Sequence, residues 1–375
     1  MSCLQFPTIL LQQQQENPLA YIINLAFMAM FFVLFVWGQR IQLTIMLRDV
    51  EYALSRLKIM RDETRRAVIE NVKRLGKSQK DPTPYIDRYL EYVLIPPVTM
   101  DPAGIVWKYD HLIGVTEDRV KDEVKAIAPE ATEAQQYNIQ NLLEIAQTLN
   151  TFYRVIRHFY LFGKKTASYY MIIQIQVILP ELMREAEAYL GSVHAFTFGH
   201  PIGDGVGPMV AARMLHGHEV SDIARDTVCG ELDYEGRRVI VIKSKGPGGT
   251  VGRPGDAVSI ILKRRKNLKR VLMVDAGLKL EGEKSGEIFE GIGAAIGGIG
   301  TEKYKIEEMV TKKKLPLYGV VVKMSSVENM TPFTKEIMAG IEQAVERVKE
   351  LIRDGTKVGD TVLLVGVGNT MGIAQ

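Results

Sequence analysis

The chain has 375 residues, of which 24% are charged, and a formal net charge of +3 at pH 7. This length predicts two or three domains, and a charge so close to neutral argues against a dedicated nucleic-acid-binding protein. The two cysteines, Cys3 and Cys229, lie too far apart in the sequence to form a disulfide framework or a zinc site. We therefore expect a main body in a reducing compartment and no nucleic-acid partner.

Glycine is distributed unevenly along the chain. Five of the 33 glycines precede residue 191, and all the others follow. Glycine disfavours helix interiors and favours tight turns and close backbone approach. The first half is therefore predicted to be helical, and the second half is predicted to be a loop-rich α/β unit.

The N-terminal region combines a polar tail with an apolar segment. Residues 1–17 are polar and rich in glutamine, and we expect them to form a disordered extracytoplasmic tail. Residues 18–38 are almost continuously apolar and long enough to be a transmembrane helix. Tyr21 and Trp37 near its ends are aromatic residues of the kind found at membrane surfaces. A signal peptide fits less well, because the apolar run is long and no basic region precedes it.

Basic residues follow this apolar segment closely. Arg40, Arg48, Arg56 and Lys58 come after it, whereas no lysine or arginine precedes it. The positive-inside rule therefore predicts that the N-terminus lies outside and that residues 39–375 are cytoplasmic. The sequence thus predicts a single-pass protein of the cell membrane, with the lipid bilayer as a partner.

Residues 39–80 are expected to continue as a juxtamembrane helix with a coiled-coil-like pattern. Apolar or small residues recur at alternating spacings of four and three. This seam fits either a homodimer through residues 46–67 or a helix that packs on its own domain. The seam consists of Met46, Val50, Ala53, Leu57, Met60, Thr64 and Ala67.

Residues 81–190 are predicted to form a helical domain. Prolines between residues 82 and 102 divide its first part into short pieces. Longer helices are expected at 116–128, 130–162 and 165–190. No residue of this domain belongs to a pattern typical of catalysis.

Residues 191–375 alternate between strand-like and helix-like segments. This alternation predicts an α/β fold with a mostly parallel sheet and helices on both faces, that is, a three-layer α/β/α domain after the transmembrane helix and the helical domain. A hairpin is expected between the second and third strands. The predicted strands are 193–198, 227–232, 238–243, 270–275, 317–324 and 361–367, and the predicted helices are 207–215, 254–265, a stretch within 287–313, and 332–353.

The ends of these strands carry the candidate site residues. Asp275 directly follows an apolar run, and ligands in open α/β sheets bind outside the carboxyl ends of the strands. Asp204 lies in the glycine-rich loop after the first predicted strand, and Glu328 lies after the strand 317–324. In a parallel sheet these loops open at one edge. The alternative for Asp275 is a side chain that caps the next turn.

Two acidic residues at one edge suit hydrolytic chemistry. Asp204 and Asp275, together with Glu328 or His200, would hold a divalent metal ion, or the two aspartates would share a proton. Either arrangement activates water for attack on a carbonyl group. We therefore consider Asp204 and Asp275 catalytic candidates, and Asp204, Asp275 and Glu328 candidate metal ligands.

A glycine-rich loop at 246–255 offers a second chemistry. Its backbone N–H groups, with Arg253 and the start of the next helix, would cradle a phosphate group. The loop matches neither GxxxxGK[ST] nor GxGxxG, and a mobile loop without a ligand is the alternative. The candidate ligand-binding residues are Gly246, Gly248, Gly249, Gly252 and Arg253.

Three segments of the second half resemble known peptidases. HAFTFGHPIGDGVGPMVAARML is similar to the strand–loop–helix opening of hydrogenase maturation endopeptidases, and VLMVDAGLKLEGE is similar to their second strand, which ends in a catalytic or metal-binding Asp. IFEGIGAAIGGIGTEKYKIE resembles the glycine-rich segment of the bacterial spore germination endopeptidase, which shares that fold. As a whole, the chain resembles an archaeal membrane-anchored family of about this length, defined as a domain of unknown function.

The resemblance implies that Asp204 and Asp275 match the two acidic positions of these peptidases. The maturation enzymes also carry a His after a later strand, where this chain has SSVENMTP, so that Glu328 would have to replace it. The leading hypothesis is a membrane-anchored cytoplasmic hydrolase that acts on a protein or peptide. The alternatives are a non-catalytic module that senses a nucleotide or another small ligand, and a membrane scaffold.

Overall fold

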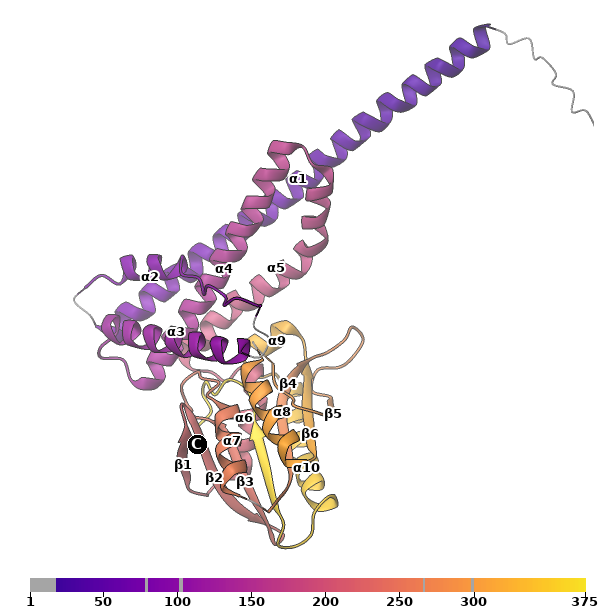
Figure 1. Ribbon diagram of the computed structural model, residues 1–375. Helices are drawn as coiled ribbons and strands as arrows, with labels where there is room; N and C mark the ends of the chain where they lie inside the picture. The colour runs from indigo at the N-terminus through magenta and orange to yellow at the C-terminus, as the bar shows by residue number, and fades with distance from the viewer. Residues whose placement is uncertain (1–17, 78–79, 101–103, 266, 298–299) are drawn as a thin grey trace, which may run out of the picture. The chain divides into compact units, whose positions relative to one another are not determined.

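The computed structural model describes residues 18–77, 80–100, 104–265, 267–297 and 300–375. The tail expected at 1–17 lies outside the described residues. Helices dominate as far as residue 198, and an α/β fold follows (Figure 1). The division of the chain into a helical half and an α/β half is therefore as predicted.

Two compact units make up the chain. The first comprises Met1–Leu54 and Ile156–Leu179, and the second comprises Ser55–Val155 and Pro180–Gln375. Three long helices belong partly to each unit. They are α1 (Pro18–Gly76), α4 (Glu133–Thr166) and α5 (Tyr169–Phe198).

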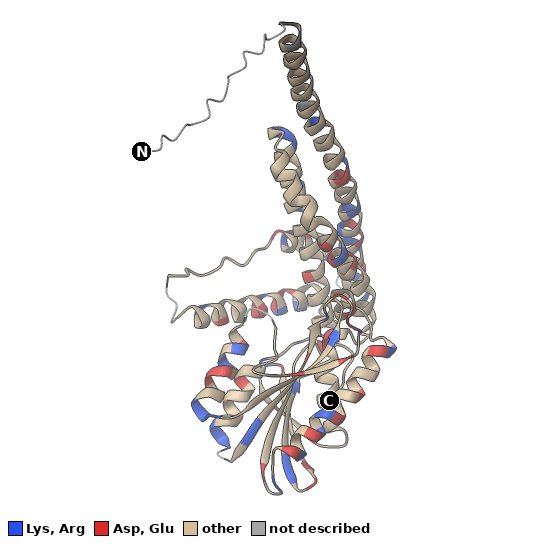
Figure 2. Cartoon of the chain, turned by 90° about the vertical axis from the view of Figure 1, so that its right-hand side faces the viewer, with Lys and Arg blue, Asp and Glu red and all other residues tan. Residues whose placement is uncertain are grey.

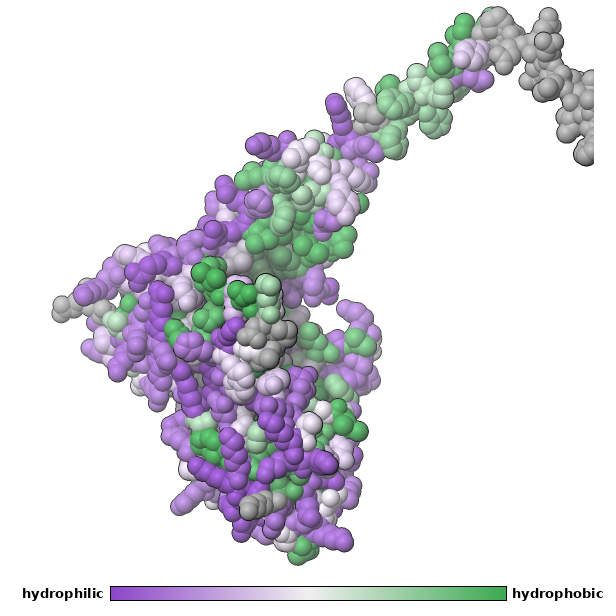
Figure 3. Space-filling view, viewed as in Figure 1, coloured by the Kyte–Doolittle hydropathy of each residue, from purple (hydrophilic) through white to green (hydrophobic). Residues whose placement is uncertain are grey.

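The first unit contains the apolar part of α1. The described side chains between Leu19 and Gln42 are exposed, and Figure 3 shows a largely apolar surface on this stretch. Among the described helices, α1 is the one that is long and apolar enough to cross a membrane, a property that signal sequences share. Because the apolar stretch is not buried, it is not a core helix of this chain.

The coiled-coil-like seam of α1 is buried within this single chain. Val50, Leu57 and Thr64 are each 0% exposed, and Met46, Ala53 and Met60 are also buried. Ala67 is partly exposed, and its neighbour Val68 is buried instead. This burial favours the helix that packs on its own domain over a homodimer through residues 46–67.

Before the sheet, the second unit also contains α2 (Thr83–Leu90) and α3 (Ile105–Ile127). Its helix α5 extends to Phe198, so the strand predicted at 193–198 is wrong. Ala188, Ser192, Ala195 and Phe196 are buried at spacings of four, three and one, which places them on one face of a helix rather than on alternating sides of a strand.

A seven-stranded sheet follows, in the order β1-β2-β3-β7-β4-β6-β5. The four central strands β3, β7, β4 and β6 are parallel to one another. Antiparallel pairing joins β2 to β3, β1 to β2, and β5 to β6. The sheet is therefore mixed, and the expectation of a mostly parallel sheet is wrong. The strands are β1 (Val220–Ala224), β2 (Thr227–Tyr234), β3 (Arg237–Ser244), β4 (Leu268–Leu278), β5 (Ile288–Ile292), β6 (Leu317–Met324) and β7 (Thr361–Gly366).

Helices cover both faces of this sheet and bury two apolar cores. Val239 and Val241 of β3 belong to the core under α6 (Val206–Leu215) and α10 (Lys335–Asp354). Ile240 and Ile242 belong to the opposite core, under α7 (Pro254–Arg264) and α8 (Thr301–Lys313). This alternation is that of a strand buried on both faces, and it produces the three layers.

Helix α6 lies unusually close to the sheet at Gly207. A methyl group at this position would lie 2.2 Å from the carbonyl oxygen of Val367 and 2.3 Å from that of Val274. Only glycine allows this separation between helix and strands.

We predict that Gly207→Ala lowers the free energy of unfolding by about 1–3 kcal/mol or more, because the new methyl group would clash with backbone. Chemical denaturation measures the change. The matched control is Gly291→Ala in β5, where no atom lies within 4 Å of the added methyl group. Equal stability of the two variants would contradict the close packing of α6.

Candidate functional site

A cavity of about 510 Å³ lies at the carboxyl ends of the parallel strands. Volumes of this size are typical of small-ligand sites. Its walls come from the loop after β3, the end of β4, the residues after β6 and β7, the first turn of α8, and helix α3. The described lining includes Ile113, Glu117, Asp204, Gly252, Arg253, Asp275, Thr301, Glu302, Asn329 and Gly368.

Asp204 and Asp275 both line this cavity. Asp275 lies on β4 and is 8% exposed. Asp204 lies in the short helix η1 (Gly203–Gly205), and its Oδ2 accepts the N–H of Asn369, which follows β7, at 2.8 Å. The sequence placed both residues at one edge of the sheet, and the structure brings them there, although Asp204 follows a helix rather than the predicted strand.

The two carboxyl groups influence each other electrostatically. Burial raises the pKa of Asp275 well above its usual value, and the negative charge of Asp204 raises it further. Burial also raises the pKa of Asp204, while the hydrogen bond from Asn369 opposes this by stabilising the charged form. The pKa values of both carboxyl groups are therefore raised, and only that of Asp275 is raised by a neighbouring charge as well as by burial.

A glycine allows the residues after β7 to lie close to the backbone of Asp204. Gly368 has a φ of +129°, and a Cβ atom there would lie 1.9 Å from the carbonyl oxygen of Asp204. A residue with a side chain would be strained at this φ and would push η1 away. The GVGN string at the end of β7 thus positions Asp204 through Gly368 and Asn369.

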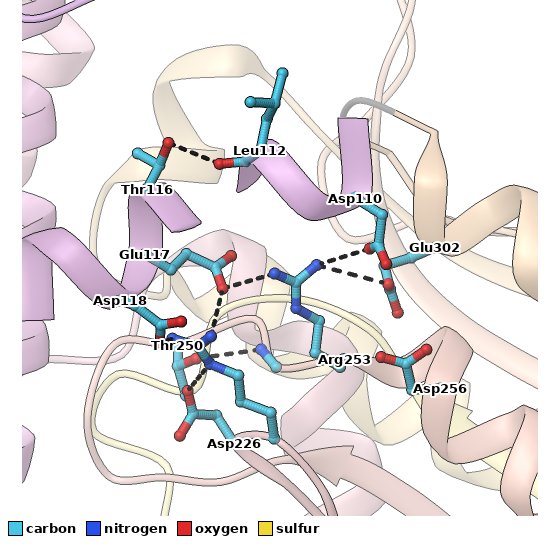
Figure 4. A network of polar contacts seen from close by, with 12 residues as sticks. Asp110, Leu112, Thr116, Glu117, Asp118, Asp226, Thr250, Arg253, Asp256 and Glu302 are labelled. Atoms are coloured by element: carbon cyan, nitrogen blue, oxygen red, sulfur yellow. Dashed lines mark hydrogen bonds and ion pairs between the residues drawn. The ribbon is translucent and has the colours of Figure 1, made fainter. Parts of the chain in front are cut away.

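Helix α3 covers one side of the cavity and is held by ion pairs (Figure 4). The guanidinium group of Arg253 is 2.7 Å from Glu117 and 3.3 Å from Asp110, both on α3, and 3.8 Å from Glu302 on α8. Arg253 is only 8% exposed. Its side chain is therefore engaged by three carboxylates of the protein itself.

Lys305 completes this ionic cluster. Its Nζ donates to Asp110, Asp256 and Glu302 at 2.9, 2.8 and 3.0 Å. Burial lowers the pKa of Lys305, but these carboxylates outweigh it, so that the net shift is upward and the ammonium group stays charged. The cluster of Arg253 and Lys305 joins α3 to α7 and α8.

Glu328 does not join the two aspartates. Its Oε2 accepts the Ser325 N–H and the hydroxyl groups of Ser325 and Ser285, all within 2.8 Å. Glu328 and Ser325 thereby form a capping box at the start of α9 (Ser326–Met330). Its expected role as a third metal ligand is replaced by this structural one.

The remaining residues do not supply a third ligand either. Over the part of the chain that the structure describes, no three His, Cys, Asp or Glu side chains are grouped so as to hold a metal ion. His200 stacks on His194 with ring centroids 5.7 Å apart and is not part of the cavity lining. The donor set at Asp204 and Asp275 thus does not fit a divalent metal held by three protein ligands.

The glycine-rich loop 246–255 does not form the expected phosphate cradle. The N–H groups of Gly249, Gly252 and Arg253 donate to side chains of the protein, at 3.1, 3.2 and 2.7 Å. The N–H of Gly255 in the first turn of α7 donates to Glu302 at 2.6 Å. These N–H groups therefore already donate to groups of the protein. The carboxylate of Glu302 occupies the place where the phosphate was expected.

The same glycines instead permit close packing. A Cβ atom at Gly246 would lie 1.8 Å from the carbonyl oxygen of Ile373, and one at Gly248 would lie 2.9 Å from Tyr137 on α4. The loop therefore packs against α4 and the C-terminal residues, while Gly252 and Arg253 reach the cavity.

Sequence reasoning missed the contribution of the helical half. Asp110 and Glu117 are seven residues apart on α3, a spacing that places both on one helix face. This spacing was the available signal. Their partner Arg253 is 143 and 136 residues away, so their role emerges only in the folded chain.

Two family models match this sequence. One, described as "Protein of unknown function (DUF1512) N-terminal domain", matches residues 24–199, and the other, "Domain of unknown function (DUF1512) C-terminal", matches residues 202–374. The chain belongs to the DUF1512 family. The two matched segments of this DUF1512 protein meet where α5 ends and η1 begins. No curated protein matches the sequence.

We predict that Arg253→Gln costs about 1–3 kcal/mol of stability, because the charged hydrogen bond to Glu117 is lost while Lys305 still pairs with Asp110 and Glu302. Chemical denaturation measures the loss, and hydrogen exchange should show faster exchange in α3. Arg238→Gln is the matched control, because Arg238 is an exposed arginine 3.8 Å from Glu231 and such surface pairs contribute about 0–1 kcal/mol. A similar loss in both variants would show that Arg253 does not anchor α3.

Proposed function

We propose that this DUF1512 protein is a membrane-anchored hydrolase in which Asp204 and Asp275 act as a proton-sharing pair. One observation carries the proposal: the carboxyl groups of the half-buried Asp204 and the buried Asp275 line one cavity, and the charge of Asp204 raises the pKa of Asp275. Pairs of carboxyl groups with pKa values pushed apart are typical of general acid–base catalysis. The similarity to maturation and spore germination endopeptidases supports the same assignment.

The pair performs the reaction as follows. Asp204, as the carboxylate, takes a proton from water, and the resulting hydroxide adds to the carbonyl carbon of the substrate while Asp275 donates its proton to the carbonyl oxygen. Asp204 then passes its proton to the leaving nitrogen, the C–N bond breaks, and Asp275 recovers its proton from the tetrahedral intermediate. The pair ends in its starting state, and one water is consumed.

The cavity supports a protein or peptide as the substrate. Its volume of about 510 Å³ accommodates a short stretch of chain, and Ile113, Val251 and Leu278 give it apolar walls. Because α3 covers one side, an extended substrate enters between this helix and the edge of the sheet.

The proposed anchor is the exposed apolar stretch of α1. The basic residues that follow it favour a single-pass orientation in the cell membrane with the N-terminus outside and residues 39–375 in the cytoplasm. A cytoplasmic site at the membrane suits substrates that are themselves attached to the bilayer.

A ligand-sensing module is the second candidate. It is favoured by the position of α3, because a nucleotide or another small molecule in the cavity would contact Ile113 and Glu117 and so act on this helix. Binding without turnover would support this function.

We predict that Asp204→Asn and Asp275→Asn each lower the rate of peptide hydrolysis by about 10²–10⁴-fold, since each removes a proton-transfer group. The test incubates the full chain with a library of internally quenched peptides. Glu328→Gln is the control: it preserves the capping box and should remain active, whereas a metal ligand at this position would not tolerate the change. Hydrolysis that persists in both aspartate variants would contradict the proposed pair.

We also predict that Asp275→Asn stabilises the protein at neutral and alkaline pH. An unfolded aspartate has a pKa of about 3.9, and the folded pKa of Asp275 is higher. Ionisation therefore destabilises the folded chain as the pH rises above about 4. This destabilisation reaches its full value once the pH exceeds the pKa of Asp275 in the folded chain.

The Tm difference between Asp275→Asn and the unaltered chain should thus be small near about pH 4 and positive near about pH 8. Glu283→Gln serves as the control with the opposite sign at the higher pH, because the hydrogen bond from Lys323 lowers the pKa of Glu283. A Tm difference for Asp275→Asn that is independent of pH would argue against the raised pKa.

A further inference from the structure

The end of the α4–α5 hairpin is an exposed surface that the proposed hydrolase does not use. This hairpin end, residues 156–179, belongs to the same compact unit as the apolar part of α1. Phe159, Leu161, Phe162 and Tyr170 within it are 38%, 46%, 44% and 70% exposed. Accessible clusters of large apolar side chains mark contact surfaces.

The hairpin end is basic as well as apolar. It contains Arg157, Lys164 and Lys165 and no Asp or Glu, and Figure 2 shows basic but no acidic residues at its tip. The neighbouring part of α1 follows the same pattern, because its first acidic residue is Asp49. An apolar surface with basic residues and exposed aromatic rings is complementary to the headgroup layer of an anionic membrane.

Helix α5 runs parallel to α1, which fixes the direction of the hairpin end. Gln176 of α5 donates to Asp49 of α1 at 3.2 Å. Further along the same two helices, Glu187 pairs with Arg56. Because the residue numbers rise together, the hairpin end points toward the apolar part of α1, as Figures 1 and 2 show.

The length of the helices gives the level of the hairpin end relative to the expected membrane surface. At 1.5 Å per residue, Asp49 lies about 18 Å beyond Trp37, and Tyr169 lies about 10 Å back from Gln176. The start of α5 is therefore about 8 Å beyond Trp37, the residue expected at the interface. Interfacial segments bury their apolar side chains about 5–10 Å deep at this boundary, so the hairpin end is at headgroup level.

Burial along α1 agrees with this level. Its described side chains are exposed as far as Gln42, Leu43 is the first that is partly covered, and Met46 is the first that is buried. Leu43 lies about 9 Å beyond Trp37 by the same rise per residue. Protein contacts on α1 thus begin where the hairpin end is placed.

We propose that the hairpin end is a second membrane-contact site, in which Tyr170 at the start of α5 inserts into the headgroup layer of the bilayer that α1 spans. Lys164 and Lys165 then lie against anionic lipid headgroups. This inference rests on the proposed anchoring through α1. A bilayer fits better than a second copy of the chain, because a self-contact between two surfaces that carry only positive charge would be repulsive.

The test uses the full chain with Cys3→Ser and Cys229→Ala, reconstituted in vesicles of equal parts phosphatidylcholine and phosphatidylglycerol. A fluorescent thiol label is attached in turn at Tyr170→Cys, Val177→Cys and Phe31→Cys. Val177 is the matched control for Tyr170, since it is 76% exposed on the same helix but about 10 Å further from the membrane. Quenching by aqueous iodide and by nitroxide-labelled lipid is measured at each position.

We expect iodide quenching to be severalfold weaker at Tyr170→Cys than at Val177→Cys, with strong quenching by lipid at the former. Lys164→Glu combined with Lys165→Glu should remove most of this difference. Equal iodide quenching at both positions, with Phe31→Cys still quenched by lipid, would refute the hairpin contact and leave the anchor intact. If Tyr170→Cys and Val177→Cys were both shielded from iodide but not quenched by lipid, the hairpin end would contact protein. That result would also refute the membrane contact. Water access at Phe31→Cys would overturn the anchoring itself.

Discussion

The buried ion pairs of Arg253 and Lys305 are the interaction on which the candidate site depends. Both cations are almost completely buried, and each forms ion pairs with carboxylates from α3 and α8. A buried charge without a partner would destabilise the fold, because it loses its hydration. Several carboxylates that accept hydrogen bonds from these cations offset that loss. The cluster holds α3, a helix of the N-terminal half, against the edge of the sheet, so that the cavity has walls from both halves of the chain.

The chemistry of the cavity follows from a different constraint, namely the position of two carboxyl groups on the walls of one cavity. Asp275 is brought there by a strand and Asp204 by a short helical turn, and Gly368 and Asn369 after β7 contact Asp204. The family models describe both halves as domains of unknown function. The proposed activity therefore depends on this geometry and on the peptidase resemblance.

The sequence predicted those strands and helices that depend on residues close together along the chain. The predicted strands 238–243 and 317–324 contain the β-branched runs Val239–Ile242 and Val320–Val322, and both were placed within one residue of β3 and β6. Edge strands β1 and β5 were missed because their half-exposed residues carry no such run. The segment 193–198 was predicted as a strand, but it continues α5, and extending a formed helix costs less than starting a new element. The position of Asp275 was predictable from strand direction, whereas Asp204 reached the same cavity from a helix, and the ion pairs of Arg253 join segments remote in sequence.

The position of β7 has a consequence for the order of events during folding. This strand lies between β3 and β4 in the centre of the sheet, although it follows all the other strands along the chain. While the ribosome is still making the protein, the sheet can form only as two separate three-stranded pieces, and the residues after β7 that hold Asp204 are absent. The contact between Asn369 and Asp204 is thus formed last, after synthesis has passed residue 369, so a nascent chain lacks the geometry that the finished cavity has.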